Sequence, residues 1–219
     1  MPEEREIKLR IEDLEGLRHA LAKLGARIVK PRVHEHNIIF DTPQFTLGKR
    51  AQLLRIRTET LAATSRKTSP RFILTFKAPI RGDGSRGKRE PHKIREEIEL
   101  QVSDPKPLAE ILEGLGLRGW FQYEKFRTTF QLRASNAWAK GLLLELDETP
   151  MGLFVELEGP ARAIDRAAQA LGFAGKDYIL ANYLALYRKY CRSRGEKPGD
   201  MLFAKLKRGD HPEKNIFLA

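Results

Sequence analysis

The sequence predicts an α+β protein, in which an eight-stranded antiparallel β-barrel with a charged interior is covered on its outside by amphipathic helices. Eight segments alternate apolar and charged residues with a period of two, which is typical of strands with one buried face. Four further segments carry apolar residues at helical spacing and can cover the apolar face from outside. Closing eight strands removes free edges and leaves an interior wide enough for a small ligand.

The expected elements follow in chain order. Residues 3–16 open with a strand that places Ile7 and Leu9 on the face opposite its glutamates. Leucines at helical spacing then predict an amphipathic helix over 12–26, ending at Gly25. Pro31 should bulge the second strand or confine it to an edge. The remaining strands are expected at 26–40, 51–59, 71–79, 92–102, 121–133, 141–148 and 152–159, and the remaining helices at 104–116, 161–172 and 178–191.

The domain organisation is expected to be simple. Residues 1–191 should form one domain, and residues 192–219 a basic C-terminal extension that is not a separate domain. The segment 81–91 is rich in glycine and charge and is predicted to be a mobile loop. For the extension, a docking helix, a contact with a partner and partial disorder all stay open.

Composition narrows the function classes. A net charge of +11 and a pI near 9.8 favour binding to polyanions, which include nucleic acid, anionic lipid and phosphorylated small molecules. The charged N-terminal stretch does not resemble a signal peptide, and no apolar run reaches the length of a membrane span, so a cytoplasmic protein is expected. The single cysteine, Cys191, has no partner for a disulfide or at zinc spacing.

The charged faces of the strands suggest a lined cavity. For any single strand, a solvated face is the more ordinary interpretation. Across the whole set, however, Glu-x-Glu pairs recur at 4/6, 97/99 and 156/158. Carboxylates spaced in this way lie roughly 6.6 Å apart and repel each other unless a cation sits between them. Arginines and lysines occupy the same faces of other strands, so one interior would hold both signs of charge.

These two sets of side chains suit a metal and a phosphate chain. Clustered carboxylates bind hard cations such as Mg²⁺ or Mn²⁺, and arginine and lysine bind phosphate oxygens. A cation that bridges phosphate oxygens and basic residues that offset developing charge together support phosphoryl transfer. A long triphosphate suits a tunnel better than a shallow cleft.

An ordered series of motifs also resembles a known family. The series comprises "EREIK", "HEHNIIFDTP", "LLRIR", "LTFKAP", "REEIEL", "LDETPMGLFVELEGP" and "NYLALY" and covers roughly residues 3–188. It is similar to the CYTH domain of the triphosphate tunnel metalloenzyme superfamily. The resemblance implies an eight-stranded barrel around a tunnel. It also implies relatives that are inorganic triphosphatases, thiamine triphosphatases or class IV adenylyl cyclases.

The resemblance further implies roles for individual residues. Many relatives carry a lysine and a Ser-Tyr pair near the last helix, where this chain has Ala181, Asn182 and Tyr183; whether Lys176 or Lys189 substitutes stays open. The metal-binding or metal-adjacent candidates are Glu4, Glu6, Glu97, Glu99, Asp147, Glu156 and Glu158. The phosphate-binding and catalytic candidates are Lys8, Arg55, Arg57, Lys77, Lys125 and Arg127, and Arg95 is a further substrate-binding candidate.

Three functions remain in consideration. The leading hypothesis is a hydrolase, dependent on Mg²⁺ or Mn²⁺, that cleaves inorganic, thiamine or nucleoside triphosphate. The alternatives are a class IV adenylyl cyclase and, without catalysis, a binder of polyphosphate or RNA. The third is disfavoured because anion binding alone gives no reason for so many carboxylates on one face. The expected partner is a small-molecule triphosphate; no membrane or nucleic acid is expected, and a homodimer is allowed.

Other signals in the sequence point to structure more than to chemistry. His34 and His36 share a strand face, but two ligands without a third indicate polar surface. The segment "GDGSRGK" lacks the spacing of a phosphate-binding glycine loop. Trp120 and Trp138 are expected to cover packing or flank a loop, because neither has the neighbours of a base-stacking platform.

Overall fold

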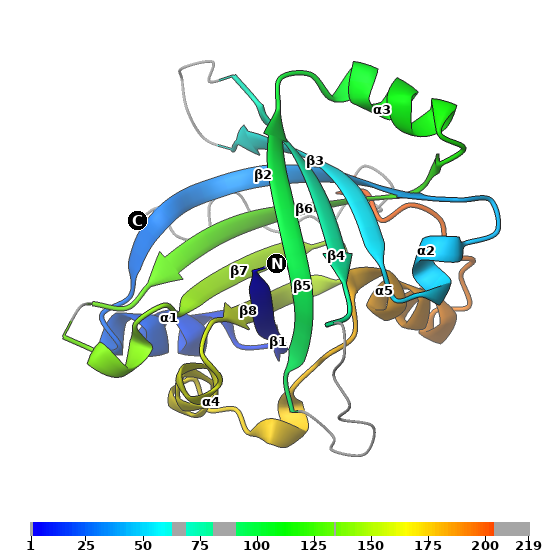
Figure 1. Cartoon of the computed structure of the whole chain (residues 1–219). Coiled ribbons are helices and arrows are strands. Elements are labelled where there is room, and N and C mark those ends of the chain that lie inside the picture. The colour runs from blue at the N-terminus through cyan, green and yellow to red at the C-terminus, as the bar shows by residue number, and fades with distance from the viewer. Residues whose placement is uncertain (1, 63–68, 81–90, 134, 204–219) are drawn as a thin grey trace.

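A computed structural model describes residues 2–62, 69–80, 91–133 and 135–203 (Figure 1). Eight antiparallel strands form a closed barrel in the order β1-β5-β4-β3-β2-β6-β7-β8, which confirms the predicted fold class. The strands are β1 Glu3–Ile11, β2 Arg27–Asp41, β3 Leu53–Leu61, β4 Arg71–Ala78, β5 Lys93–Val102, β6 Arg118–Gln131, β7 Leu143–Thr149 and β8 Gly152–Glu158.

The helices lie on the outside of this barrel (Figure 1). The predicted helices are present with shifted ends. The last one begins at Tyr183 and not at residue 178, because the side chain of Asn182 caps it by accepting a hydrogen bond from the Ala185 amide at 2.9 Å. The helices are α1 Leu14–Lys23, α2 Thr46–Lys49, α3 Pro105–Gly114, α4 Ala161–Ala170 and α5 Tyr183–Ser193, with 3₁₀ turns η1 Ala137–Ala139 and η2 Gly175–Asp177.

The short helix α2 was not predicted. It is held by Asp41, whose carboxylate accepts backbone hydrogen bonds from Leu47 at 2.9 Å and Gly48 at 2.8 Å. Phe45 and Ala51, which flank α2, both have positive φ angles, of 56° and 54°. Non-glycine residues adopt this conformation at a cost in free energy, so surrounding contacts must hold the α2 segment in place.

Three register shifts interrupt the pairing of β2 with β6, and the first lies between Ile28 and Lys30. The register shifts between Lys30 and Val33, which confirms the disturbance expected at Pro31. The third shift follows Ile39, where Ile39 pairs with Phe121 but Phe40 pairs with Gly119. Trp120 is therefore the extra residue of a β-bulge, a feature that changes the direction of a side chain.

The hydrophobic core lies between the strands and the helices. Ile7 and Leu9 of β1 pack with Leu157 of β8, and Ile164 of α4 belongs to the same buried cluster. Burying each such side chain contributes roughly 1.5–3 kcal/mol. A second cluster joins α3 to the outer face of β3 and β4, and a third joins α5 to β6 and β8. The first two clusters lie on the outward faces of the strands, so the alternate residues face the interior; the third cluster, which includes Ile39 and Tyr123, lies on the interior side at one end of the barrel.

Part of the C-terminal extension belongs to the barrel. Met201 is fully buried and forms a parallel bridge with Tyr123 of β6. Its backbone binds Gln122 and Glu124, each at 2.9 Å. Residues 204–219 of the predicted extension, and residues 81–90 of the predicted mobile loop, lie outside the described part of the chain. Among the described helices, none combines the length and the apolar character that crossing a membrane requires.

Candidate active site

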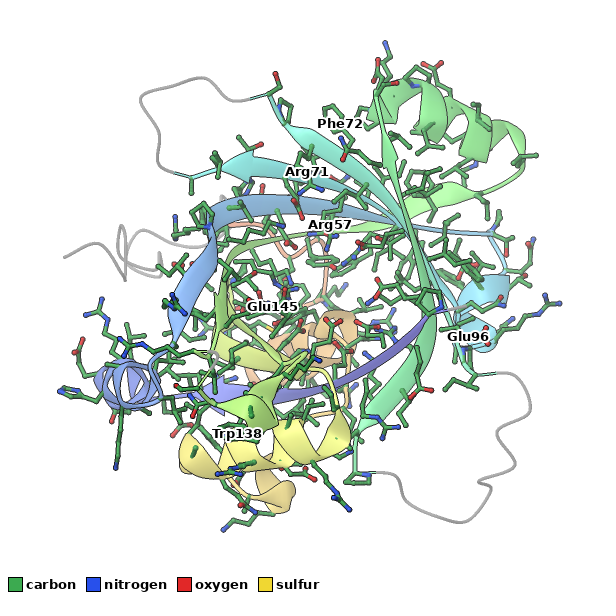
Figure 2. All side chains as sticks on the ribbon, turned by 60° about the vertical axis from the view of Figure 1, so that its left-hand side comes forward. Arg57, Arg71, Phe72, Glu96, Trp138 and Glu145 are labelled. Atoms are coloured by element: carbon green, nitrogen blue, oxygen red, sulfur yellow. The ribbon has the colours of Figure 1, made fainter. Side chains whose placement is uncertain are left out.

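The interior of the barrel is a cavity of about 740 Å³. All the predicted site residues except Asp147 line it. In Figure 2, Arg57 and Glu145 lie inside the ring of strands, whereas Trp138 lies at its outside, beside α4. The period-two pattern therefore identified the interior face of the strands.

The two signs of charge are unevenly distributed around the cavity. Carboxylates concentrate on the neighbouring strands β7, β8, β1 and β5, and cations concentrate on β4, β3 and β6. We call these the acidic wall and the basic wall. Lys8, Lys93 and Arg95 are the cations that the acidic strands themselves contribute. The acidic wall comprises Glu4, Glu6, Glu97, Glu99, Glu145, Glu156 and Glu158, and the basic wall comprises Arg55, Arg57, Lys77, Lys125 and Arg127.

Asp147 organises the basic wall from behind. It is fully buried and accepts hydrogen bonds from Lys125 at 2.9 Å, from Arg127 at 2.6 Å and from the Tyr183 hydroxyl at 2.5 Å. Arg127 also binds Glu145 and Glu156. Burial alone would lower the pKa of Arg127, but Asp147 and Glu145 raise it well above its ordinary value. Asp147 therefore fixes two cations in position and does not itself reach the cavity.

Two arginines of β3 lie on the same wall. Arg57 donates to Glu99 at 2.8 Å and lies 3.3 Å from Glu59. Arg55 donates to the Tyr123 hydroxyl at 3.0 Å and to Thr75 at 3.2 Å. The buried Nε atom of Arg55 has no hydrogen-bond partner among the described residues, whereas the Nε atom of Arg57 forms the ion pair with Glu59. A ligand with anionic oxygens would satisfy such a donor.

Part of the acidic wall is neutralised by lysines and arginines. Lys8 donates to Glu156 at 2.5 Å. Burial favours protonation of Glu156, but Lys8 and Arg127 hold its pKa well below the ordinary range. For Glu6, burial and Glu156 favour protonation, yet Lys93, at 2.6 Å, and Lys8 lower its pKa to about 2. Both carboxylates are therefore ionised at neutral pH.

On the rest of the acidic wall, the carboxylates carry more negative charge than the neighbouring cations neutralise. The side chain of Glu158 forms no hydrogen bond or ion pair with another described residue, and Glu158 lies directly opposite Glu6 across the β1–β8 pair. Burial, together with Glu145 and Glu4, raises its pKa to about 8. Burial also raises the pKa values of Glu97 and Glu145. A proton or a cation would relieve this repulsion.

Glu35 is a cavity residue that was not predicted from the sequence. Glu35 is fully buried, lines the cavity and has no hydrogen-bond partner for either carboxylate oxygen among the described residues. Its nearest cations are Lys125 at 3.5 Å and Arg127 at 4.0 Å. The period-two alternation along β2 would have identified it, because Glu35 lies on the same face of the strand as Asn37 and Ile39, and Ile39 lines the cavity. Glu145 and Lys93 are further cavity residues that were not singled out, and Tyr183 was named only for its position near the last helix.

Two lysines and two histidines that the sequence brought into consideration lie outside the cavity lining. Lys176 and Lys189, considered as substitutes for a lysine of the relatives, are both exposed and do not line the cavity. Tyr183 occupies that region, with its ring 4.4 Å from the Lys8 ammonium. His36 lies 3.1 Å from Gln122, and His34 lies 3.6 Å from Glu124, outside the cavity lining. Both histidines are half-buried on β2 and lie away from the cavity.

The oxygen donors on the acidic wall fit a hard divalent cation. Glu4 Oε2 is buried without a hydrogen-bond partner, and Glu158 is unpaired among the described residues. In the described ranges, no three His, Cys, Asp or Glu side chains stand together as a ready-made metal cluster. The carboxylates instead turn toward lysines and arginines, so a cation would have to compete with these ion pairs.

Comparisons with known proteins agree with this architecture. A protein of Methanocaldococcus jannaschii, described as a putative adenylate cyclase, is 28% identical over 154 residues, covering 70% of this chain and 74% of that protein. A putative adenylate cyclase of Vibrio parahaemolyticus superposes with a TM-score of 0.63 at 18% identity, covering 82% of this chain and 94% of that one.

Two further solved structures share the fold. A conserved hypothetical protein of Pyrococcus furiosus has a TM-score of 0.60 at 25% identity, with 84% and 99% of the two chains covered. A putative adenylyl cyclase of Hippeastrum, described as having a dominant triphosphatase activity, has a TM-score of 0.53 at 21% identity, with 89% and 97% covered. The model of the CYTH domain family matches residues 2–173. This chain therefore belongs to the CYTH domain family.

Proposed function

We propose that the protein is a divalent-metal-dependent hydrolase that cleaves a triphosphate inside the barrel. The observation that carries this proposal is the division of one cavity into two charged walls. Arg55 and Arg57 line the interior on one side, and uncompensated carboxylates line it on the other. A triphosphate and a cation together would complement both walls.

The basic wall would bind and orient the phosphate chain. Arg127 and Lys125 are already fixed by Asp147, so they lose little freedom when they engage phosphate oxygens. Such preorganised cations stabilise charge that develops on the phosphates during transfer. Lys8, held at 2.5 Å by Glu156, adds a further cation on the facing strand.

Enzymes of the CYTH superfamily include adenylyl cyclases and triphosphatases and depend on divalent metals. Here Glu4, Glu6, Glu97 and Glu158 would hold Mg²⁺ or Mn²⁺, which when bound neutralises phosphate oxygens. Occupation of this wall by a cation would also relieve the repulsion around Glu158. The walls need no rearrangement of the backbone for this, because their carboxylates already face the cavity.

Class IV adenylyl cyclase is the second candidate. The name of the Methanocaldococcus relative favours it, since a cyclase would use the same walls for the triphosphate of ATP. The two reactions differ in the nucleophile, which is water for the hydrolase and a ribose hydroxyl for the cyclase. The walls bind phosphates in either case.

One assay separates the candidates. The full chain is incubated with inorganic triphosphate, thiamine triphosphate and ATP, each with Mg²⁺ or Mn²⁺ and with EDTA as control. Orthophosphate release that requires metal supports the hydrolase, whereas pyrophosphate together with cyclic AMP supports the cyclase. Binding without any product would overturn both and favour a non-catalytic polyphosphate binder.

A further inference from the structure

The strand β2 carries an acid where the basic wall is densest in cations. In the barrel, β2 lies between β3 and β6, the two strands that supply most of the basic wall. A surface that binds phosphate would favour another lysine or arginine at this place. The interior face of β2 instead presents a carboxylate, an amide and an apolar side chain, which belong to Glu35, Asn37 and Ile39.

Glu35 does not act as a directly bonded counter-ion of its neighbours. Glu35 is fully buried, and its nearest cations, Lys125 at 3.5 Å and Arg127 at 4.0 Å, lie beyond ordinary hydrogen-bond length. Both cations already bind Asp147, at 2.9 Å and 2.6 Å. The carboxylate of Glu35 is therefore held near two cations whose direct partner is another residue.

Two neighbouring interior side chains of β2 have no partner for any of their polar atoms. Within the described part of the chain, neither oxygen of Glu35 forms a hydrogen bond, and neither do the amide oxygen and nitrogen of Asn37, which is also fully buried. Buried polar atoms are nearly always hydrogen-bonded, either to protein or to ordered water. Burial alone would raise the pKa of Glu35, but Lys125 and Arg127 hold it below its ordinary range. Glu35 is therefore ionised, and its partner must be a donor that reaches it through the cavity.

A water molecule meets these requirements. Separations of 3.5 Å and 4.0 Å allow one water to contact Glu35 and a neighbouring cation together. An ordered water needs about two to four polar partners. Lys125 and the amide nitrogen of Asn37 can donate to it, and Glu35 can accept from it. Such a water would lie beside Lys125 and Arg127, and therefore beside any phosphate chain that these cations bind.

We propose that Glu35 is a catalytic residue that holds the attacking water against the terminal phosphate of the substrate. This assignment rests on the proposed function for the position of the phosphates. The water oxygen bonds to the terminal phosphorus, the bond from this phosphorus to its bridging oxygen breaks, and the other phosphates leave with the electron pair. One proton of the water passes to Glu35 and then to an oxygen of the released orthophosphate. Lys125 and Arg127 neutralise the charge that develops on the phosphates.

The test uses variants of the full chain that change the carboxylate and keep the packing. Glu35→Gln preserves the shape and removes the negative charge, and Glu35→Asp keeps the charge but withdraws it by one methylene group. Glu148→Gln is the control, because Glu148 is also fully buried but lies outside the cavity lining and already binds Arg32 at 2.7 Å and 2.8 Å. With Mg²⁺, kcat and KM are measured for inorganic triphosphate, thiamine triphosphate and ATP. Calorimetry in EDTA measures affinity, and thermal melts verify folding.

We expect Glu35→Gln to lower kcat roughly 100-fold, because the water is no longer oriented. Its affinity for triphosphate should be unchanged or higher, because the basic wall loses a negative charge that repels phosphate. Glu35→Asp should lower kcat at least about tenfold at unchanged affinity, because the acceptor is displaced and not removed. Glu148→Gln should lower the melting temperature and leave kcat unchanged.

A merely structural role would give a different pattern. If Glu35 only fixed Lys125 and Arg127, Glu35→Gln would weaken triphosphate binding and lower the melting temperature together. That pattern, or an unchanged kcat, would overturn the inference. If Glu35→Gln does not fold, Glu35→Asp decides in the same way, since an unchanged kcat there would exclude a role in holding the water.

A crystal structure of the wild type supplies a readout that does not depend on activity. We expect an ordered water within hydrogen-bond distance of Glu35 and of Lys125 or Asn37, and a direct bond between Glu35 and Lys125 without this water would overturn the assignment. A wild type that releases no orthophosphate from any of the three substrates would overturn the proposed hydrolase and the attacking water together. Orthophosphate release that persists unchanged in Glu35→Gln would leave the hydrolase standing and remove only the role of Glu35.

Discussion

The two walls of the cavity hold their charges in opposite ways. On the basic wall each cation is fixed by a neighbour, as Lys125 and Arg127 are by Asp147, and donors remain for a ligand. On the acidic wall the carboxylates outnumber their cations, and the pKa of Glu158 rises to about 8 through burial and its acidic neighbours. One wall is therefore preorganised for anions, whereas the other is stabilised by a proton or a cation.

This difference follows from where the counter-charges originate. The cations of β6 receive their carboxylate from the adjacent strand β7, so the pairs form within the sheet. Glu158 pairs across the sheet with Glu6 on one side and Leu143 on the other, and neither supplies a cation. Like charges directly opposite each other destabilise a sheet.

Replacing Arg127 by alanine should have the largest effect. Arg127 binds Asp147, Glu145 and Glu156, so its removal leaves buried carboxylates without their main partner. Loss of one partner of a buried pair costs about 3–5 kcal/mol of unfolding free energy. Denaturant melts should show this loss, and turnover should disappear. Arg127→Lys should recover part of the stability. An unchanged denaturant melt for Arg127→Ala would show that Arg127 is not the main partner of these buried carboxylates.

Replacing Arg57 by alanine should weaken triphosphate binding with a smaller effect on folding. A charge-assisted hydrogen bond contributes about 1.5–3 kcal/mol, which corresponds to roughly 10- to 150-fold in affinity. Arg71→Ala is the matched control, since Arg71 lies 3.6 Å from the same Glu59 but does not line the cavity. Calorimetric titration of inorganic triphosphate measures both variants. Equal losses would mean that Arg57 acts only by holding Glu59.

Replacing Glu158 by glutamine should stabilise the metal-free protein at alkaline pH. Its folded pKa of about 8 lies above the ordinary 4.5, so the folded state holds the proton more tightly and loses stability as pH rises between these values. The variant avoids this loss and should be more stable than wild type by roughly 2 kcal/mol at pH 9, after allowance for partial solvent exposure. At pH 5 the difference should nearly vanish.

The control for this measurement is Glu113→Gln, which changes an exposed glutamate of α3. Mg²⁺ or Mn²⁺ should raise the melting temperature of the wild type more than that of Glu158→Gln, because ligands stabilise the state that binds them. Equal metal stabilisation of both proteins would remove Glu158 from the proposed metal donors and leave the acidic wall without its distinguishing feature.

The sequence predicted the barrel and its interior face well, because alternation is a local property of each strand. The sequence could not show that Glu156 and Glu158 have different charged surroundings, because both lie on one face of β8 and were expected to repel each other. Glu156 is instead neutralised by Lys8 and Arg127, which are remote from it in the sequence. The bulge at Trp120 and the helix α2 likewise depend on contacts between remote segments, which no periodicity reveals.

The smallest effect should follow replacement of Thr75 by valine, at the seam between the two walls. Thr75 is fully buried on β4; its hydroxyl accepts from Arg55 at 3.2 Å and donates to Glu99 at 2.9 Å. Valine has nearly the same shape but removes both contacts, which should cost about 1 kcal/mol of unfolding free energy. Because Arg55 still binds Tyr123, its position should change little, and triphosphate affinity should fall only a few-fold. Ile73→Val, on the same strand, is the packing control. A loss of affinity as large as that of Arg57→Ala would show that the Thr75 hydroxyl couples the two walls, so that they do not act independently.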